Sequence, residues 1–254
     1  MRKVTAARLA QVSVDLTGPH GRRRHLHGIN LTLEPGILHA VVGESGAGKS
    51  LSIATMTGML PPTARVHGHV VVQGLDLTTA SASAWRRVRG RLVGVVPQSP
   101  LTHLTPMRTV GAQLREVDPD ADPRELCDRV GLDHDVLRLR PYELSGGMAQ
   151  RVGVACALAG APRVILADEP TSARDPELKV SALQLLRERA DAGVAVLLVT
   201  HDLDVLLDTA VADTATVLLS GHIEAQGTAE EVFSRPDGYV GRLLRALPRH
   251  GLHP

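Results

Sequence analysis

The chain has 254 residues, enough to bury a substantial hydrophobic core, and 43% of its residues are hydrophobic. Its formal net charge of +1 does not provide the electrostatic field that would point to nucleic acid as the main partner. Its two cysteines, Cys127 and Cys156, form no disulfide framework and show no paired metal-ligand spacing, so we expect a reducing compartment.

The sequence contains no segment that we expect to enter a membrane. The first residues, Met1 to Thr5, are basic but are not followed by a hydrophobic signal core. No run approaches the roughly 20 apolar residues that a bilayer-spanning helix needs. If the protein acts at a membrane, we expect something else to anchor it there.

In the first part of the chain, hydrophobic patterning predicts strands around a glycine-rich loop. The five expected strands lie over Val12–Leu16, Leu26–Leu33, Ile37–Val42, His67–Gln73 and Leu92–Val96. The first two flank a polar turn, and the third enters the glycine-rich loop. A helix is expected directly after that loop, over Lys49–Met59.

The next part of the chain is predicted to be helical. Two helices, Thr109–Glu116 and Arg124–Val130, are separated by a Pro- and Asp-rich segment, and a third helix is expected over Gly146–Ala159. The first two belong to an expected helical insertion.

Strands and helices then alternate again. Apolar strands are expected over Val164–Ala167 and Val194–Val199, with a helix between them that Asp175 can cap, with Pro176 at its first position. Near the end, Thr228-Ala229-Glu230-Glu231 fits a capping box that opens a helix. The alternation predicts a largely parallel sheet, and the closely spaced early and late strands predict antiparallel additions.

The glycine-rich loop, Gly43-Glu44-Ser45-Gly46-Ala47-Gly48-Lys49-Ser50, matches the pattern of a phosphate-binding loop between a strand and a helix. Its glycines let the backbone approach phosphate closely, and the amide hydrogens at the helix start favour the anion. Lys49 can reach the terminal phosphates, and Ser50 can coordinate magnesium. Taken alone, such a loop also fits kinases and GTPases.

An acidic pair ends the later apolar strand. The pattern Val164-Ile165-Leu166-Ala167-Asp168 places Asp168 at the carboxyl end of a buried strand, where it would lie beside magnesium, and Glu169 follows directly. A surface acidic pair is the alternative, but the position after a phosphate-binding loop favours a site.

A third segment, Leu144-Ser145-Gly146-Gly147-Met148, opens the third predicted helix. Ser145 can cap the helix, and the amides of Gly146 and Gly147 create a compact anion site at its positive end. An ordinary glycine-containing helix start is the alternative.

Together these three segments resemble the ATP-binding subunit of an ABC transporter, over about residues 12 to 235. The resemblance implies ATP and Mg²⁺ as cofactors. It also implies an α/β fold, with a P-loop NTPase (RecA-like) core, a mainly parallel sheet, antiparallel β additions and an inserted α-helical signature subdomain. Residues 1–254 would form one ABC ATPase domain, with the catalytic core and β subdomain over about 1–95 and 161–254 and the helical subdomain over about 96–160.

The resemblance also implies roles for single residues. Glu169 would polarise the attacking water, His201 would sense the terminal phosphate, and Gln98 would contact magnesium or water. Magnesium would be held by Ser50, Gln98 and Asp168. The expected nucleotide-binding residues are Gly43, Glu44, Ser45, Gly46, Ala47, Gly48, Lys49, Ser50, Leu51, Ser145, Gly146, Gly147 and Asp175.

Three positions depart from the family's usual pattern. Met148 stands where glutamine is common, and Arg174, in the D-loop Ser172-Ala173-Arg174-Asp175, stands where leucine is usual. These two changes leave open whether both ATP sites of a dimer work equally. The first strand also ends, at Leu16, without the aromatic residue that often stacks on adenine. His20 or His25 could substitute, or both could belong to a solvated turn.

The flanks of the signature segment narrow the resemblance. The segment Arg140–Arg151 resembles that of importers for dipeptides, oligopeptides and nickel. This implies an ATP-hydrolysing subunit that powers the uptake of peptides or nickel complexes at the cytoplasmic face of the cell membrane, as a peripheral protein. Its partners would be two membrane-spanning permease subunits, a second ABC ATPase subunit and, indirectly, an extracellular solute-binding protein, with no nucleic acid.

Two other functions remain as alternatives. The first is a soluble ABC-type ATPase acting in nucleic-acid metabolism, which usually carries coiled-coil, zinc or duplicated domains; the sequence shows none of these. The second is a regulatory nucleotide-binding subunit with poor hydrolysis, which Met148 and Arg174 favour and which Glu169 and His201 oppose.

Overall fold

The computed structural model describes residues 5–19, 21–170, 176–235 and 237–247. Its centre is a six-stranded sheet in the order β10-β9-β3-β8-β7-β6. The strands are β3 (Leu38–Val42), β6 (Val93–Val96), β7 (Val164–Asp168), β8 (Ala195–Thr200), β9 (Thr214–Leu219) and β10 (His222–Thr228). All pairs are parallel except β9 with β10. Strands β3 and β8 are buried along their whole length. Because both faces of such parallel strands are covered, their sequences are continuous apolar runs, as the sequence pattern predicted.

A second, antiparallel sheet has the order β2-β1-β4-β5. Its strands are β1 (Ala7–Gly18), β2 (Gly21–Leu33), β4 (Arg65–Val72) and β5 (Leu75–Asp76). Helix α1 (Lys49–Thr57) contributes Ile53 and Met56 to the apolar cluster that joins this sheet to one face of the six-stranded sheet. The early strands are therefore longer than the sequence predicted, because β1 and β2 pair over almost their full length.

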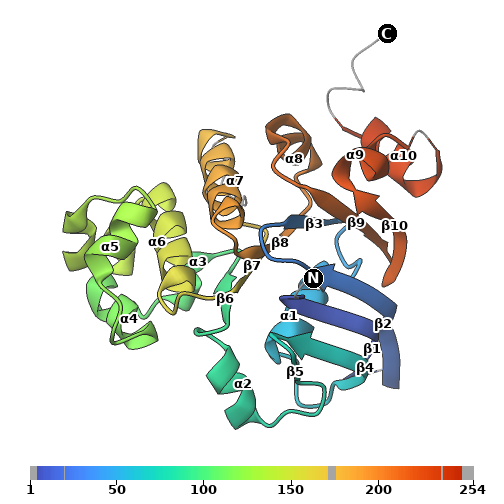
Figure 1. Cartoon of the computed structure of the whole chain (residues 1–254), viewed down its shortest axis with the longest axis horizontal. Helices are drawn as coiled ribbons and strands as arrows, with labels where there is room; N and C mark the ends of the chain where they lie inside the picture. Colours follow the sequence, from blue (N-terminus) through green and yellow to red (C-terminus); the bar gives the residue numbers. More distant parts are fainter. Residues whose placement is uncertain (1–4, 20, 171–175, 236, 248–254) are drawn as a thin grey trace.

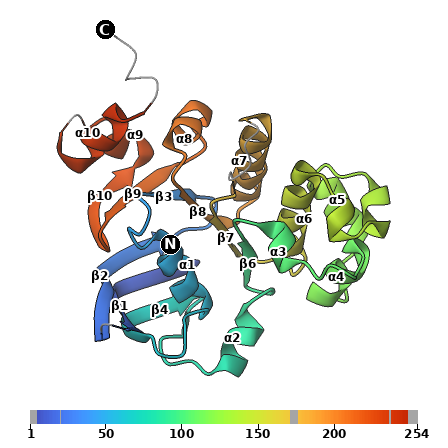
Figure 2. The ribbon, with the colours of Figure 1, turned by 180° about the vertical axis from the view of Figure 1, so that it is seen from behind.

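The remaining α-helices lie in the segments that connect or follow the strands (Figure 1). They are α2 (Ala82–Val88), α3 (Pro100–His103), α4 (Val110–Val117), α5 (Pro123–Arg129), α6 (Gly146–Leu158), α7 (Pro176–Asp191), α8 (Leu203–Thr209), α9 (Ala229–Phe233) and α10 (Gly238–Arg245). Helices α4, α5 and α6 gather beyond β6 at one end of the molecule, as both ribbon views show (Figures 1 and 2). No helix in the described ranges is long and apolar enough to cross a bilayer.

Helix α1 is shorter than the predicted helix Lys49–Met59. It ends at Thr57 because Gly58 adopts a left-handed conformation, with φ of 62°. A side chain could not occupy this position, since a Cβ on Gly58 would lie 2.3 Å from the ring of Trp85. The capping box at Thr228 is confirmed: its hydroxyl accepts a hydrogen bond from the Glu231 amide, and the Glu231 carboxylate accepts one from the Thr228 amide.

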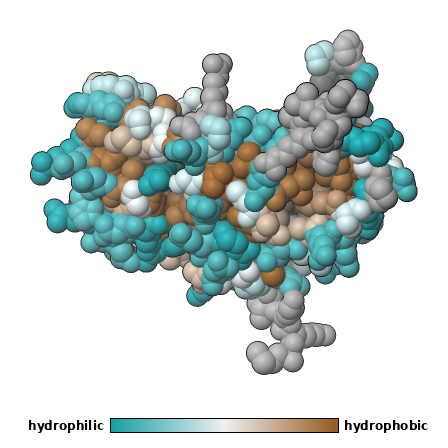
Figure 3. All heavy atoms as spheres, turned by 90° about the horizontal axis from the view of Figure 1, so that it is seen from above, coloured by the Kyte–Doolittle hydropathy of each residue, from teal (hydrophilic) through white to brown (hydrophobic). Residues whose placement is uncertain are grey.

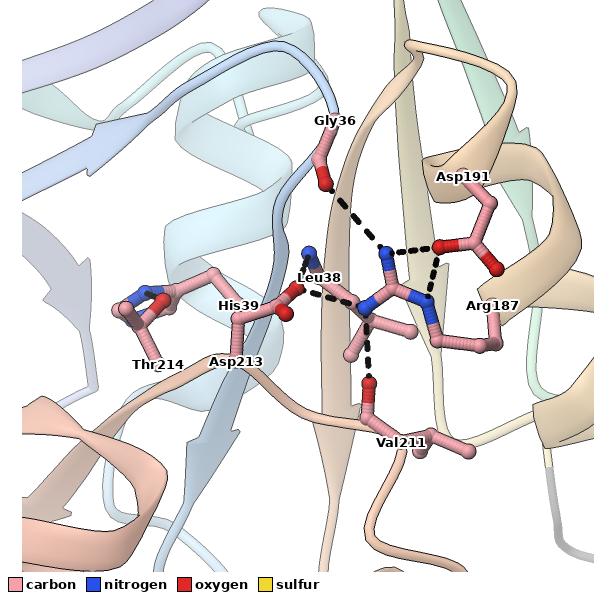
Figure 4. Close-up of polar contacts among 8 residues, drawn as sticks. All are labelled: Gly36, Leu38, His39, Arg187, Asp191, Val211, Asp213 and Thr214. Atoms are coloured by element: carbon pink, nitrogen blue, oxygen red, sulfur yellow. Dashed lines mark hydrogen bonds and ion pairs between the residues drawn. The ribbon is translucent and has the colours of Figure 1, made fainter.

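Arg187, on α7, holds the amino-terminal edge of the parallel strands together (Figure 4). Its guanidinium donates hydrogen bonds to the carbonyl oxygens of Gly36 (3.3 Å) and Val211 (3.1 Å) and to the Asp213 carboxylate (2.6 Å), and it also contacts Asp191. Asp213 in turn accepts a hydrogen bond of 2.8 Å from the Leu38 amide. The starts of β3 and β9 are thereby fixed to α7.

His39 lies beside this network, on β3, and is almost fully buried (Figure 4). Its Nδ1 lies 2.7 Å from the Thr214 hydroxyl, and its Nε2 lies 2.8 Å from the Thr216 hydroxyl. Burial lowers the pKa of His39 to about 4. The imidazole is therefore neutral at physiological pH and links β3 to β9.

The surface combines polar and apolar areas (Figure 3). Seen from above, polar side chains form most of the outline, and apolar side chains lie in the areas between them (Figure 3). The Arg187 network lies at the amino-terminal ends of the parallel strands. Ligands of α/β sheets bind at the opposite edge, where the strands end, so we expect a site there.

Candidate active site

The glycine-rich loop follows β3 and leads into α1. Gly43, Gly46 and Gly48 have φ angles of 154°, 81° and 104°. A Cβ on Gly43 would lie 2.2 Å from the carbonyl oxygen of Leu218, and one on Gly48 would lie 2.5 Å from the side chain of Leu26. The backbone conformation favours glycine at both positions, and at Gly43 the neighbouring backbone also leaves no room for a side chain.

Lys49 reaches back into this loop. Its side chain is buried, and its ammonium donates hydrogen bonds to the carbonyl oxygens of Gly43 (2.7 Å) and Glu44 (3.0 Å). Burial lowers the pKa of Lys49, while the nearby carboxylates of Glu169 and Asp168 act in the opposite direction. A positive charge thus lies within the loop, held by neutral carbonyl groups.

Ser50 and Asp168 meet next to Lys49. The Ser50 hydroxyl donates a hydrogen bond of 2.9 Å to the Asp168 carboxylate at the end of β7. Burial raises the pKa of Asp168, and the hydrogen bond from Ser50 opposes this shift. A hydroxyl beside a partly desolvated carboxylate is the kind of oxygen donor set that Mg²⁺ prefers, so these two residues fit the predicted metal ion.

Three predicted residues converge at the ends of neighbouring strands. Gln98 follows β6, Glu169 follows β7 and His201 follows β8. The Gln98 amide donates a hydrogen bond of 2.7 Å to the Glu169 carboxylate, and Nδ1 of His201 lies 3.0 Å from its other oxygen. The carboxylate is thus held from both sides.

The backbone of Glu169 is unusual for a residue with a side chain. Its φ is 47°, in the left-handed region, and its amide donates a hydrogen bond of 2.8 Å to the Val199 carbonyl oxygen on β8. This conformation places the Glu169 side chain between Gln98 and His201, with only 17% of it exposed.

Gln98 and Glu169, with Lys49 and Ser50, border a cavity of about 410 Å³, whose lining does not include Asp168 or His201. Its lining combines the glycine-rich loop and the start of α1 with Gln98, Glu169 and two residues of the antiparallel sheet, Leu16 and His25. The complete lining consists of Leu16, His25, Ser45, Gly46, Gly48, Lys49, Ser50, Leu51, Gln98 and Glu169. His25 therefore lies on the cavity wall, and His20 lies outside the described residues. Leu16 pairs with Arg23 across the hairpin, so Leu16, Arg23 and His25 share one face of it.

The signature segment occupies a different place. Ser145 caps α6, since its hydroxyl accepts a hydrogen bond of 3.2 Å from the Met148 amide. Gly146 borders a second cavity, of about 330 Å³, beside Gln98 and Pro170. A Cβ on Gly147 would lie 2.7 Å from Leu178. Of the residues that the structure describes, none from the signature lines the cavity around Lys49. Asp175 and the preceding D-loop residues lie outside the described residues.

Tyr239 was not expected at the site. It lies on α10 and is 8% exposed, and its hydroxyl accepts a hydrogen bond of 3.3 Å from the Glu44 amide in the glycine-rich loop. The two residues are 195 positions apart, so the local sequence pattern contains no signal for this contact.

Comparison with known proteins identifies similar chains. A family model described as "ABC transporter" matches residues 26–172. The oligopeptide transport ATP-binding protein OppD of Mycobacterium tuberculosis is 38% identical over 239 residues, which cover 88% of this chain and 39% of that protein. The dipeptide transport ATP-binding protein DppD of Bacillus subtilis is 35% identical over 269 residues, covering 100% of this chain and 79% of that protein. The chain thus spans about two fifths of the mycobacterial relative's length.

Two solved structures of ABC proteins are similar to this chain in fold. The dimeric ATP-binding cassette MJ0796 bound to ADP and Pi is 26% identical, with a TM-score of 0.76, covering 87% of this chain and 98% of that one. CbiO1 from Clostridium perfringens, part of an ABC transporter complex, is 25% identical, with a TM-score of 0.77 and a coverage of 97% for both chains. These similarities confirm the predicted α/β fold class.

Proposed function

Because this chain belongs to the ABC transporter family of ATP-binding proteins, we propose that it binds and hydrolyses ATP as one subunit of a peptide importer. The observation that carries the proposal is the convergence of Gln98, Glu169 and His201 beside a cavity bordered by the glycine-rich loop. Peptides are the proposed cargo because relatives at 34–38% identity are named for peptide transport.

The phosphates of ATP would lie along the amides of Gly46 to Ser50, at the positive end of α1. Lys49 would turn its ammonium from the loop carbonyl groups toward the terminal phosphates. Ser50, Asp168 and Gln98 would hold Mg²⁺, which neutralises charge on the phosphate oxygens when bound. The buried Asp168 carboxylate supports this assignment, because a cation would favour its charged form.

Glu169 would act as the base. Its carboxylate would accept a proton from the attacking water, while the Gln98 amide and the His201 ring keep the carboxylate pointed into the cavity. His201 would also contact the terminal phosphate, as its position after β8 next to Glu169 supports.

A second ATPase subunit would complete the site. The signature residues Ser145, Gly146 and Gly147 lie away from the cavity around Lys49 in their own chain, so they are free to face a nucleotide bound by another subunit. Asp175 would take part in the same contact. We propose that the chain works as a homodimer or heterodimer in which each ATP lies between two subunits, and that residues 96–160 form the helical subdomain that presents the signature.

A groove next to Gln98 supports a membrane partner. It has a volume of about 370 Å³ and lies between β6, α3, α4 and α6. Its lining includes Pro97, directly before Gln98, and the exposed apolar side chains of Met59 and Val117 (60% and 42% exposed). We propose that a cytoplasmic segment of each of two permease subunits docks here, so that the protein lies at the inner membrane face. A solute-binding protein would deliver the cargo from outside.

The Glu169→Gln variant tests the catalytic proposal. It keeps the shape of the side chain but removes the base, so we expect MgATP to bind and its hydrolysis to fall at least about a hundredfold. We also expect the variant to accumulate as an ATP-bound dimer, measured by size-exclusion chromatography with light scattering. Glu125→Gln, an exposed substitution on α5, is the matched control. Unchanged hydrolysis without a trapped dimer would contradict the proposal.

Affinity purification from detergent-solubilised cells tests the partner. The transporter assignment predicts co-purification of membrane-spanning subunits, and Val117→Asp, in the groove, should reduce their recovery because it buries a charge against them. Recovery of nucleic acid or ribosomes without a membrane subunit would favour the alternative of an ATPase in nucleic-acid metabolism.

A further inference from the structure

The glycine-rich loop is held from outside by the last third of the chain. The Gly221 amide, in the turn between β9 and β10, donates a hydrogen bond of 3.0 Å to the Ala47 carbonyl oxygen. The Leu218 carbonyl oxygen lies so close to Gly43 that no side chain fits there. The Tyr239 hydroxyl, on α10, accepts the Glu44 amide hydrogen. The loop therefore has an inner surface toward the cavity and an outer surface against β9, β10 and α10.

The contact with Tyr239 differs from the other two because a side chain makes it. The ring is buried in the same apolar cluster as Val42, Val217 and Val232, so it is anchored in the core. Burial raises the pKa of the Tyr239 phenol, and the hydrogen bond from the Glu44 backbone acts in the opposite direction. The hydroxyl thus contacts the Glu44 backbone. Arg242, one turn later on α10, lies 5.8 Å from the ring centroid.

The peptide group between Gly43 and Glu44 is held on two sides. Its N–H, that of Glu44, donates a hydrogen bond to the Tyr239 hydroxyl, and its carbonyl oxygen, that of Gly43, accepts a hydrogen bond from Lys49. In the proposed function Lys49 turns toward the phosphates, so its hydrogen bonds to the carbonyl oxygens of Gly43 and Glu44 are lost. The hydrogen bond between the Glu44 amide and Tyr239 then remains to hold the start of the loop.

We propose that Tyr239 is a positioning residue for nucleotide binding, whose hydroxyl holds the Glu44 peptide in place when Lys49 leaves the loop carbonyl groups for the phosphates. The inference rests on the proposed function. It makes the docking of α10 and the occupancy of the cavity mutually dependent, because two events that stabilise the same loop conformation must favour one another to the same extent.

The Tyr239→Phe variant removes only the hydroxyl. We expect its Kd for MgATP, measured by calorimetry on the full chain, to rise about three- to tenfold, the range for the loss of one hydrogen bond. The rate of hydrolysis at saturating MgATP should change less than twofold. Tyr142→Phe is the matched control, since the chain has two tyrosines and Tyr142 is 66% exposed. Equal Kd values for Tyr239→Phe and the unmodified chain would overturn the proposal.

Hydrogen exchange gives a second test that a merely structural role would not pass. In the unmodified chain, MgATP should slow amide exchange in residues 238–245 as well as in the loop, and Tyr239→Phe should abolish the first effect and keep the second. Exchange in residues 238–245 that ignores MgATP in the unmodified chain would overturn the proposal even if the variant fails to fold. If the unmodified chain does not bind MgATP, the proposed function fails with it; normal binding by both chains removes only the role of Tyr239.

Discussion

The side-chain amide of Gln98 donates a hydrogen bond of 2.7 Å to the carboxylate of Glu169, a residue 71 positions later in the chain. The two meet because β6 and β7 are neighbouring parallel strands and both residues lie just beyond the strand ends. Pro97, directly before Gln98 in the chain, lines the groove that we propose for a permease segment. We therefore expect a displacement at the groove to reach the proposed base, Glu169, through Gln98.

This contact predicts the behaviour of Gln98→Ala. Without the amide, the Glu169 carboxylate loses one of its two restraints, so we expect MgATP hydrolysis to fall about ten- to hundredfold while the Kd changes less. Steady-state rates and calorimetry measure the two quantities. Gln73→Ala, in the turn between β4 and β5, is the control. A Gln98→Ala variant with normal turnover would show that His201 alone positions the carboxylate.

His25 predicts an effect on affinity without one on turnover. His25 lies on the cavity wall with Leu16, in the part of the lining that the antiparallel sheet contributes. We expect the adenine ring of ATP to lie there. Loss of one stacking contact in His25→Ala should raise the Kd for MgATP about three- to tenfold. Fluorescence titration with a labelled ATP analogue measures this change. His134→Ala, between α5 and α6 in the chain and outside the cavity lining, is the control. An unchanged Kd would mean that adenine binds elsewhere.

Arg187 predicts an effect on stability without one on the site. Arg187→Ala leaves the Gly36 and Val211 carbonyl groups and the Asp213 carboxylate without this donor, so we expect the free energy of unfolding to fall by about 2–4 kcal/mol. Urea unfolding measures the loss. The surface variant Arg129→Ala should change little, since its ion pair with Glu125 is exposed. Below the unfolding transition, MgATP affinity should be retained, because the network lies at the opposite strand edge.

His39 predicts a pH dependence of stability. Its pKa is about 4 in the folded chain and about 6.5 in an unfolded one, so the unfolded state binds more protons between these values. Stability is then fully present above pH 6.5 and decreases as the pH falls toward 4, with a loss of about 2 kcal/mol between pH 7.5 and pH 5. Urea unfolding at both pH values should show this loss in the unmodified chain and a smaller one in His39→Gln.

The two carboxylates with strongly lowered pKa values, Asp15 and Asp76, do not obscure that measurement. The pKa of Asp15 is lowered to about 2, mainly by its hydrogen bond from Arg24, and that of Asp76 to about 2 by hydrogen bonds from Thr78. Stability that depends on these charges is lost only below about pH 4. Equal pH slopes in the unmodified chain and in His39→Gln would therefore mean that His39 is not the group that titrates.

Much of the fold could be predicted from local sequence. The run from β3 through the glycine-rich loop to α1 combines an apolar strand, glycines at positive φ and a helix start, and all of these signals lie within a few residues of one another. The end of α1 differs from the prediction, although Gly58 is a local stop signal. The packing of Trp85 against Gly58 could not be predicted, since Trp85 lies on a helix that the hydrophobic pattern did not indicate.

The site was only partly predictable for a related reason. Gln98 and His201 are single polar residues after strands, and only the family resemblance identified them; their contacts with Glu169 depend on the strand order β8-β7-β6, which is not local information. Likewise, Leu16 and His25 face the cavity because of the register between β1 and β2. Tyr239 lies on a short helix near the other end of the chain and had no local signal at all.

At Glu169 the backbone conformation favours glycine, whereas the proposed chemistry requires a carboxylate. Glycine at φ of 47° would avoid a strain of about 1 kcal/mol or more, yet the chain has a glutamate there. A Glu169→Gly chain should therefore be a better folder and a poorer enzyme. Selection for thermal stability alone, without a demand for ATP hydrolysis, would favour glycine at this position.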